Sequence, residues 1–176
     1  MTRWDEQVLA AANWWQAMMS SPRGDNRAAI ARLRQARTPM EAFMVPATLD
    51  LIRRLKVNRD NIDRVAILAS VLAHLKPDFR ETKSIGRSLG RSKINEPESA
   101  VLSETRFQRL LQAEDDELLD QFRRAVRLLK GAANPESIAR TILFWNDRTR
   151  KDLIFDYYNV SFDVEDQSDR PSQGSV

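Results

Sequence analysis

The stretch Glu114–Gly131, EDDELLDQFRRAVRLLKG, decides the fold of this chain. Its acidic residues fill the first turn, where carboxylates stabilise the positive end of a helix dipole. Gly131 is the kind of residue that ends a helix. Between these signals, apolar side chains recur every three or four residues, which gives a helix one buried face; they are Leu118, Phe122, Val126 and Leu129. The stretch therefore predicts an amphipathic helix over Glu114–Lys130.

Helical spacing also dominates on both sides of this stretch, and no segment shows the alternation of a half-buried strand. Thr38-Pro-Met-Glu41 is a capping box with proline at the first helical position, and Asn134 precedes a second such proline. The predicted fold class is therefore all-α. The other predicted helices run over about Trp4–Met19, Asp25–Arg37, Thr38–Leu55 with a break near Pro46, Asp60–Leu75, Ser103–Leu111, Asn134–Trp145 and Asp147–Tyr158.

The polar region between Pro77 and Pro97 divides the helices into two groups. We predict two small helical bundles packed together, and a polar, acidic C-terminal tail that buries nothing obvious and is expected to be mobile. The predicted boundaries are an N-terminal bundle over residues 1–80, a basic connecting segment over 81–96, a C-terminal bundle over 97–160 and the tail over 161–176.

Composition excludes some classes of protein and disfavours others. The 176 residues include no cysteine, which excludes disulfides and thiolate chemistry and fits a reducing compartment. No run approaches the roughly 18 apolar residues of a membrane span, and the N-terminus lacks a signal-peptide pattern. We expect a cytoplasmic protein with no membrane partner.

Side chains suited to catalysis are sparse. The only histidine, His74, follows apolar residues at the end of a predicted helix, where a packing or surface role is the simpler interpretation. The chain has five glycines and contains no nucleophile elbow, phosphate-binding loop or dinucleotide fingerprint. The acidic run Glu114–Glu117 suggests magnesium, but its place in a first helical turn favours capping. We predict a non-enzymatic protein with no catalytic residue, no metal and no cofactor; a magnesium-dependent hydrolase is the remote alternative.

The net charge of +3 hides an uneven distribution along the chain. Residues 163–176 carry four acids and one arginine, a local charge of −3, so the other 162 residues carry +6. From Phe79 to Asn95, five basic residues face a single acid, Glu81. Clustered positive charge of this kind favours a polyanionic partner.

A row of cations in the connecting segment is the clearest such cluster. Read as a helix, Lys83, Arg87 and Arg91 stack into one stripe at four-residue spacing, followed by Lys93. Like charges at this spacing destabilise an isolated helix, and the intervening glycines allow close backbone approach. We therefore predict that the stripe faces a polyanion; the alternative is a solvated charged face.

Other basic residues gather on three of the predicted helices. Those on the helix over Glu114–Lys130 crowd its C-terminal turns, where cations also belong electrostatically, so binding and structural roles both stay open there. Those on the last helix occupy its first turn, where cations are unfavourable, which points to an external anion. The three groups are Arg23, Arg27 and Arg34; Arg123, Arg124, Arg127 and Lys130; and Arg148, Arg150 and Lys151.

The aromatic residues do not form a platform on which bases could stack. Most of them fall at core spacing, so packing is the better account, and the predicted surface contacts phosphates rather than bases. The residues in question are Trp14, Trp15, Phe144, Trp145, Phe155 and Tyr158.

Short blocks spread over most of residues 10–160 combine in a characteristic order. They are Trp15, Gly24–Ala28, Ala31–Arg34, Ser84–Leu89, Ile94–Glu96, Arg106–Leu111, Phe122–Arg124, Ala139–Arg140, Trp145 with Arg148, and Asp156–Tyr158. In this order and spacing the chain resembles the CasB family, the small subunit of the type I-E CRISPR Cascade surveillance complex. Some relatives carry a basic residue where this chain has Gln112, Asp115 or Asp147, and the acidic tail is peculiar to this chain.

The resemblance implies a non-enzymatic, all-helical protein that acts in antiviral defence. Its implied partners are the backbone and large subunits of Cascade, a second copy of itself, the guide RNA ribonucleoprotein, and the target and non-target DNA strands. Its basic surface is implied to hold the DNA of the R-loop. Positions carried over from the family, together with Lys93 from the basic row, give the candidate contacts Arg27, Arg34, Lys83, Arg87, Arg91, Lys93, Arg106, Arg109, Arg123, Arg124 and Arg148.

Two functional hypotheses follow. The first is a structural subunit that binds DNA phosphates and stabilises the R-loop, because modest contacts can tip a nearly balanced exchange of strands. The second is a protein-interaction scaffold whose basic faces dock acidic partners without meeting nucleic acid. A salt series separates them, since only phosphate binding gives a steep dependence on salt concentration.

Overall fold

The computed structural model describes residues 1–20, 24–78 and 81–162. Within these ranges the chain forms ten α-helices, two 3-10 helices and no strand, which confirms the predicted all-α class. The helices are α1 Arg3–Ser20, α2 Gly24–Gln35, α3 Pro39–Phe43, α4 Pro46–Leu55, η1 Arg59–Asn61, α5 Ile62–Leu72, α6 Ile85–Leu89, η2 Pro97–Ser99, α7 Glu104–Gln112, α8 Asp115–Leu128, α9 Pro135–Leu143 and α10 Asp147–Tyr157.

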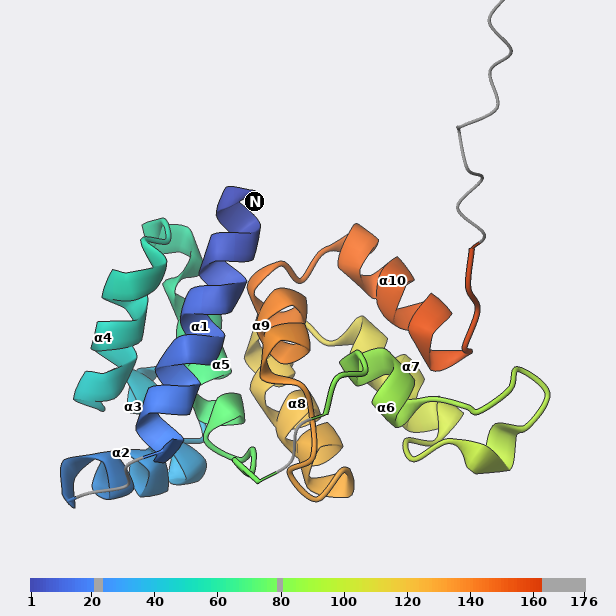
Figure 1. The fold of residues 1–176 in the computed structure, drawn as a ribbon, viewed down its shortest axis with the longest axis horizontal. Helices are drawn as coiled ribbons and strands as arrows, with labels where there is room; N and C mark the ends of the chain where they lie inside the picture. The colour runs from blue at the N-terminus through green and yellow to red at the C-terminus, as the bar shows by residue number, and fades with distance from the viewer. Residues whose placement is uncertain (21–23, 79–80, 163–176) are drawn as a thin grey trace, which may run out of the picture.

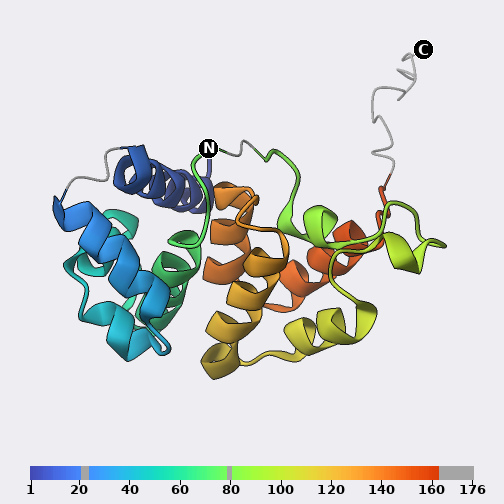
Figure 2. The same ribbon diagram turned by 90° about the horizontal axis from the view of Figure 1, so that it is seen from below.

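The helices form three groups along the long axis of the molecule. In Figure 1, α1 to α5 lie at one end, α8 and α9 lie in the middle, and α6, α7 and α10 lie at the other end, an order that the view in Figure 2 repeats. Helices α1 and α5 pack on α9, and α5 also packs on α8, while α6 packs on α10 and α7 on α8. One apolar cluster runs through all these contacts, from Leu33 and Leu51 to Phe122 and Tyr157. The domain boundaries themselves stay a prediction.

Helix α8 has the buried face that its sequence predicts. Leu118, Phe122 and Val126 are fully buried, and the acidic residues occupy its first turn. The helix ends at Leu128, and the turn that follows contains Gly131, whose φ of +81° suits glycine. A Cβ atom there would lie 2.9 Å from the backbone oxygen of His74, and the Gly131 oxygen accepts a hydrogen bond from the Lys76 amide at 3.0 Å. The end of α8 is thereby tied to the residues that follow α5.

The predicted caps of α3 and α9 are confirmed. The Thr38 hydroxyl accepts a hydrogen bond from the Glu41 amide at 3.2 Å, and the Glu41 carboxylate accepts one from the Arg37 amide at 2.8 Å. The Asn134 side chain accepts hydrogen bonds from two amides in the first turn of α9. These side chains satisfy helix-end amides that have no partner within the helix.

The prediction of one cationic stripe on a helix through Lys83, Arg87 and Arg91 is wrong. Helix α6 covers only Ile85–Leu89, so Arg87 alone of the three lies on it. The helix is short because Gly90 leaves it to meet α10: a Cβ atom on Gly90 would lie 2.1 Å from the Tyr157 oxygen. The next amide, that of Arg91, donates to this oxygen at 2.7 Å.

Two features of the sequence analysis fall on parts of the chain that the structure leaves undescribed. Arg23 lies in the range 21–23, and the acidic tail lies outside the described residues from Asp163 onward. No helix among the described residues has the length and apolar character needed to cross a membrane.

Candidate nucleic-acid interface

Arg87 holds the end of α10 against α6. Its Nε donates to Asp156 at 3.3 Å, its Nη1 to the side-chain oxygen of Asn159 at 2.6 Å, and its Nη2 to the Ser161 hydroxyl at 3.1 Å. The neighbouring Ser84 hydroxyl also donates to Asp156, at 2.6 Å. All three nitrogens of the Arg87 guanidinium therefore have partners within the chain.

Arg91 is bound in the same way on the other side of Gly90. Its guanidinium donates to the Ile94 oxygen at 2.8 Å and to Glu104 at 2.9 Å, and it lies 4.8 Å from the centre of the Tyr158 ring. Only 11% of its side chain is exposed. The glycines near these arginines do allow close backbone approach, as the sequence suggests, but the approaching element is α10.

Arg123 joins the two halves of the chain. From α8 it donates to the backbone oxygens of Ala36 at 2.7 Å and Arg34 at 2.6 Å, at the C-terminal end of α2. Helix-end carbonyls lack partners within the helix and carry the negative end of its dipole, so a buried cation is well placed there. The residue is 9% exposed, and burial followed by the charge of Arg127 lowers its pKa. The geometry gives Arg123 a packing role, although the sequence places it among the contact candidates.

A groove between α7 and α8 gathers the remaining arginines of this region. Arg106 and Arg109 reach it from α7, and Arg124 and Arg127 reach it from α8. Each pair is three residues apart and so shares one helix face, while the intervening Phe107 and the adjacent Leu110 turn into the core. The groove holds a volume of about 500 Å³. The other lining residues are Leu102, Leu110, Gln121 and Leu128, with no acid among them.

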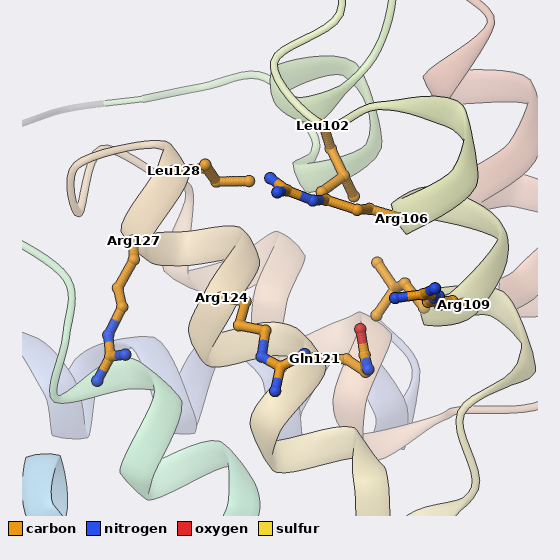
Figure 3. Close-up of a pocket in the computed structure, with 8 residues that line it drawn as sticks. Leu102, Arg106, Arg109, Gln121, Arg124, Arg127 and Leu128 are labelled. Carbon is orange, nitrogen blue, oxygen red and sulfur yellow. The ribbon is translucent and has the colours of Figure 1, made fainter.

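The close-up view shows how these side chains share the groove (Figure 3). Arg106 extends from α7 across to Leu128, and Arg109 points from α7 toward Gln121 of α8. Arg124 lies along α8, and Arg127 points away from α7, toward the N-terminal half. Leu102 and Leu110, at 4% and 1% exposure, give the groove an apolar floor. Of the candidate residues, the structure brings Arg106, Arg109 and Arg124 together here.

The four groove arginines lack the counter-charges found elsewhere on the molecule. Among the described residues, no hydrogen bond or ion pair of a side chain involves Arg106, Arg109, Arg124 or Arg127, whereas Arg53, Arg54, Arg64, Arg140 and Arg150 all meet a carboxylate. Like charges gathered without acids repel one another, and an external anion relieves that repulsion. Arg127 is absent from the predicted contact residues, although it lies three residues after Arg124 on the same helix and could have been predicted from that spacing.

The positive charge continues beyond the groove toward α2. Arg34 donates through Nε to the Ala73 oxygen at 2.7 Å, which leaves its terminal nitrogens for another partner. Burial, followed by the charges of Arg123, Arg127 and Arg34, lowers the pKa of His74 to about 4. His74 is therefore neutral at physiological pH, and the charges of Arg123, Arg127 and Arg34 all lie near it.

The other candidates lie apart from the groove lining. Lys83 and Arg27 are exposed, and no side-chain partner is described for either. Lys93 pairs with Glu96 at 3.2 Å. Arg148 is exposed in the first turn of α10 and lines a second hollow, which also contains Asp5 and Asp152. This hollow has mixed charge, so it suits a polyanion less well than the arginine groove.

The acidic run at the start of α8 forms no described metal site. Asp115 pairs with Arg64 at 3.3 Å. Across the described ranges, no three histidine, aspartate or glutamate side chains converge in a way that could hold a metal ion. Asp115, Asp116 and Glu117 lie in the first turn of α8, at the positive end of the helix dipole, although the N-cap residue Glu114 makes no capping hydrogen bond through its side chain.

The fold and the groove together define an all-helical protein with a concentrated basic surface. The chain belongs to the family of CRISPR-associated protein Cse2, whose sequence model matches residues 26–158. This is the CasB family of type I-E Cascade small subunits, which confirms the resemblance found in the sequence. The fold is similar to that of TTHB189, a CRISPR-associated protein of the Cse2 family from Thermus thermophilus whose crystal structure is known. The two structures superpose with a TM-score of 0.66 and 18% sequence identity, and the match covers 90% of this chain and 99% of that chain. No curated protein sequence matches the chain.

Proposed function

We propose that the chain is a non-catalytic subunit of Cascade whose α7–α8 groove binds the sugar-phosphate backbone of DNA and so stabilises the R-loop. The observation that carries this proposal is the convergence of Arg106, Arg109 and Arg124 on a groove lined by no carboxylate, with Arg127 at its edge. Guanidinium groups bind phosphate oxygens through paired hydrogen bonds, and such contacts read no base sequence.

The mechanism needs only modest affinity. Pairing of guide RNA with its target replaces one duplex by another of similar stability, so a few contacts to the opened strands shift the balance. Each phosphate that an arginine neutralises releases counterions and adds a salt-dependent increment to binding. The groove therefore favours the open state without influencing which sequence is chosen.

Assembly with other components completes the proposal. Family membership supports a place among the backbone and large subunits and the guide RNA ribonucleoprotein, beside a second copy of this chain, in the cytoplasm. Compared with the sequence analysis, the proposed contact set is narrower. It keeps Arg34, Arg106, Arg109 and Arg124 and adds Arg127. It leaves out Arg87, Arg91 and Arg123, whose guanidinium groups are occupied within the chain. It also leaves out four residues that lie apart from the groove, namely Arg27, Lys83, Lys93 and Arg148.

The test measures DNA binding by the isolated protein across a series of salt concentrations. Replacing Arg106, Arg109 and Arg124 by glutamine is expected to lower the slope of log K against log salt concentration by roughly 2–3, because each phosphate contact contributes about 0.7–0.9. The matched control, R53Q/R54Q/R59Q, removes the same charge from α4 and η1 at the other end of the molecule and should keep most of the slope. Equal slopes for the two variants would contradict the proposal.

A second candidate function is a scaffold that docks an acidic protein partner in the same groove. The apolar floor formed by Leu102 and Leu110 favours it, because protein interfaces combine such floors with arginine. A scaffold predicts that the isolated protein shows no steep salt dependence toward DNA. It also predicts that the glutamine variant is lost from the assembled complex rather than weakened in R-loop formation.

A further inference from the structure

One exposed tryptophan stands apart from the packed aromatic residues. Trp4, in the first turn of α1, is 53% exposed, whereas Trp14, Trp15 and Trp145 are at most 5% exposed. The Trp4 ring packs against Phe144, directly after α9, with the ring centres 4.4 Å apart. The rest of the ring offers a flat apolar surface to solvent, and a nucleic-acid base stacks well on such a surface.

Trp4 and Phe144 line a hollow that shares no residue with the arginine groove. The starts of α1 and α10 and the end of α9 form it, and its volume of about 450 Å³ lies within the range of small-molecule sites. Every other lining residue is polar or charged. The hollow therefore suits a small ligand with one flat apolar part better than it suits a protein, because the centre of a protein interface is more apolar and carries few charges.

Two of the four charged residues in the hollow neutralise each other. Arg140 donates to Asp5 at 2.8 Å and ties α9 to α1, and this hydrogen bond is the main cause that lowers the pKa of Asp5 to about 2. Arg148 and Asp152 lie one turn apart and exposed on α10, and within the described chain neither has a side-chain hydrogen bond or ion pair. One cation and one carboxylate therefore remain for a ligand.

A nucleotide carries the groups that match these residues. Its base stacks on an aromatic ring, and its phosphate accepts paired hydrogen bonds from a guanidinium group. A carboxylate accepts hydrogen bonds from N–H groups on the edge of a base. Guanine has two neighbouring N–H donors on its pairing edge, whereas thymine has one. This edge is free for a protein only where the base is unpaired.

We propose that the hollow lined by Trp4, Arg148 and Asp152 binds one unpaired nucleotide and prefers guanine. Trp4 stacks on the base, Asp152 accepts hydrogen bonds from its edge, and Arg148 binds the phosphate. The site itself stands on the hollow and its free groups, and only the source of the nucleotide, a strand opened in the R-loop, rests on the proposed function. The hollow thereby adds contact with a base to the phosphate contacts of the groove.

The site is tested with single nucleotides and the isolated protein. Each of the four tryptophans gives one indole N–H signal in a heteronuclear NMR spectrum, and only Trp4 has an exposed ring. Deoxyguanosine monophosphate at low salt is expected to shift the Trp4 signal and to leave the other three in place. It should bind about 5-fold or more tightly than thymidine monophosphate. D152N should lose this preference, and R148Q should bind the guanine nucleotide no more tightly than deoxyguanosine, which has no phosphate.

The stacking role of Trp4 is tested through the backbone signals of Arg148 and Thr149. Trp4→Ala should weaken nucleotide binding about 5- to 150-fold, as loss of stacking on an aromatic ring does, and Trp4→Phe should keep most of the affinity. The matched control is Leu9→Ala, which truncates another exposed apolar side chain of α1 outside the hollow and should bind as the wild type does.

Absence of a Trp4 shift, or equal affinity of Trp4→Ala and the wild type, overturns the site, and equal affinity for the two nucleotides overturns the preference for guanine. Loss of nucleotide binding when Arg106, Arg109 and Arg124 are glutamine would put the nucleotide in the groove and overturn the site as well. A Trp4→Ala protein that binds nucleotide normally but is lost from the assembled complex would make the hollow a protein interface. The proposed function fails separately, because it is judged by the salt slope of the groove variants.

Discussion

Replacement of Arg123 by methionine separates a structural arginine from a binding one. Arg123 and Arg124 are neighbours on α8, yet one is buried against the end of α2 and the other is exposed in the groove. The substitution R123M keeps most of the apolar volume and removes the guanidinium that donates to the Ala36 and Arg34 oxygens. The matched substitution R124Q removes the same charge one position further along.

The expected magnitude follows from these two hydrogen bonds. Hydrogen bonds from a charged group contribute about 1.5–3 kcal/mol each, so their loss costs about 3–6 kcal/mol. Methionine needs no desolvation of a charge, which offsets part of that cost, and a net destabilisation of about 2–4 kcal/mol remains. For a protein of this size, that corresponds to a drop in Tm of roughly 5–15 °C. The R124Q protein should unfold within about 0.5 kcal/mol of the wild type, as exposed substitutions usually do.

The assay combines urea unfolding, followed by circular dichroism, with DNA affinity measured on the folded proteins. R123M is expected to lose stability and, at a temperature where it is folded, to keep the salt slope of DNA binding. R124Q is expected to keep its stability and to lose about 0.7–0.9 of that slope. The reasoning is refuted if R123M is as stable as the wild type, or if it loses as much of the slope as R124Q does.

Three further outcomes are expected. Tyr157→Phe removes the buried hydroxyl that donates a hydrogen bond to the Leu102 oxygen. Urea titrations should show a free energy of unfolding lower by about 1–2 kcal/mol, and a variant as stable as the wild type would contradict a role for this hydrogen bond. Gly90→Ala brings a Cβ atom to 2.1 Å from the Tyr157 oxygen, so hydrogen exchange in the variant should show α10 opening far more often than α5. Equal protection of α10 in the variant and in the wild type would show that the contact is dispensable. The pKa of His74 is lowered to about 4, below the 6.5 of an unfolded histidine, so the folded protein loses stability as the pH falls from about 6.5 to 4. The His74→Gln variant should therefore lose less stability than the wild type between pH 7 and 5. Identical curves of unfolding free energy against pH for the two proteins would contradict the lowered pKa.

Local signals predicted much of the fold. The periodicity of Leu118, Phe122 and Val126, the capping box at Thr38 and the glycine at 131 each act over a few residues, and the structure places all of them as expected. The prediction for the connecting segment was wrong because the conformation of this segment depends on α10, more than 60 residues away. Close packing of Gly90 on Tyr157 ends α6 after five residues, and nothing near residue 90 in sequence reveals that partner.

The predicted contact arginines also divide into those whose side chains stay exposed and those that the fold uses for contacts within the chain. Arg106 and Arg109 were predicted only through the resemblance to the CasB family, and Arg124 through that resemblance and through the basic end of its helix. Arg87, Arg91 and Arg123 have the same chemistry in sequence, but the structure uses their guanidinium groups to hold distant segments together. Whether an arginine is free depends on which carbonyls and carboxylates the fold brings to it, and only the folded chain shows that.

The central claim is that DNA lies in the α7–α8 groove when the complex opens its target. Gln121, which lies between the arginines of the two walls, is the position from which to test it directly. A photo-reactive Gln121→benzoylphenylalanine subunit, assembled into Cascade with guide RNA and target, is expected to form adducts with DNA. The same group at the exposed Leu49 of α4 should form few. Adducts from position 121 to protein alone, or equal DNA adducts from both positions, would contradict the account.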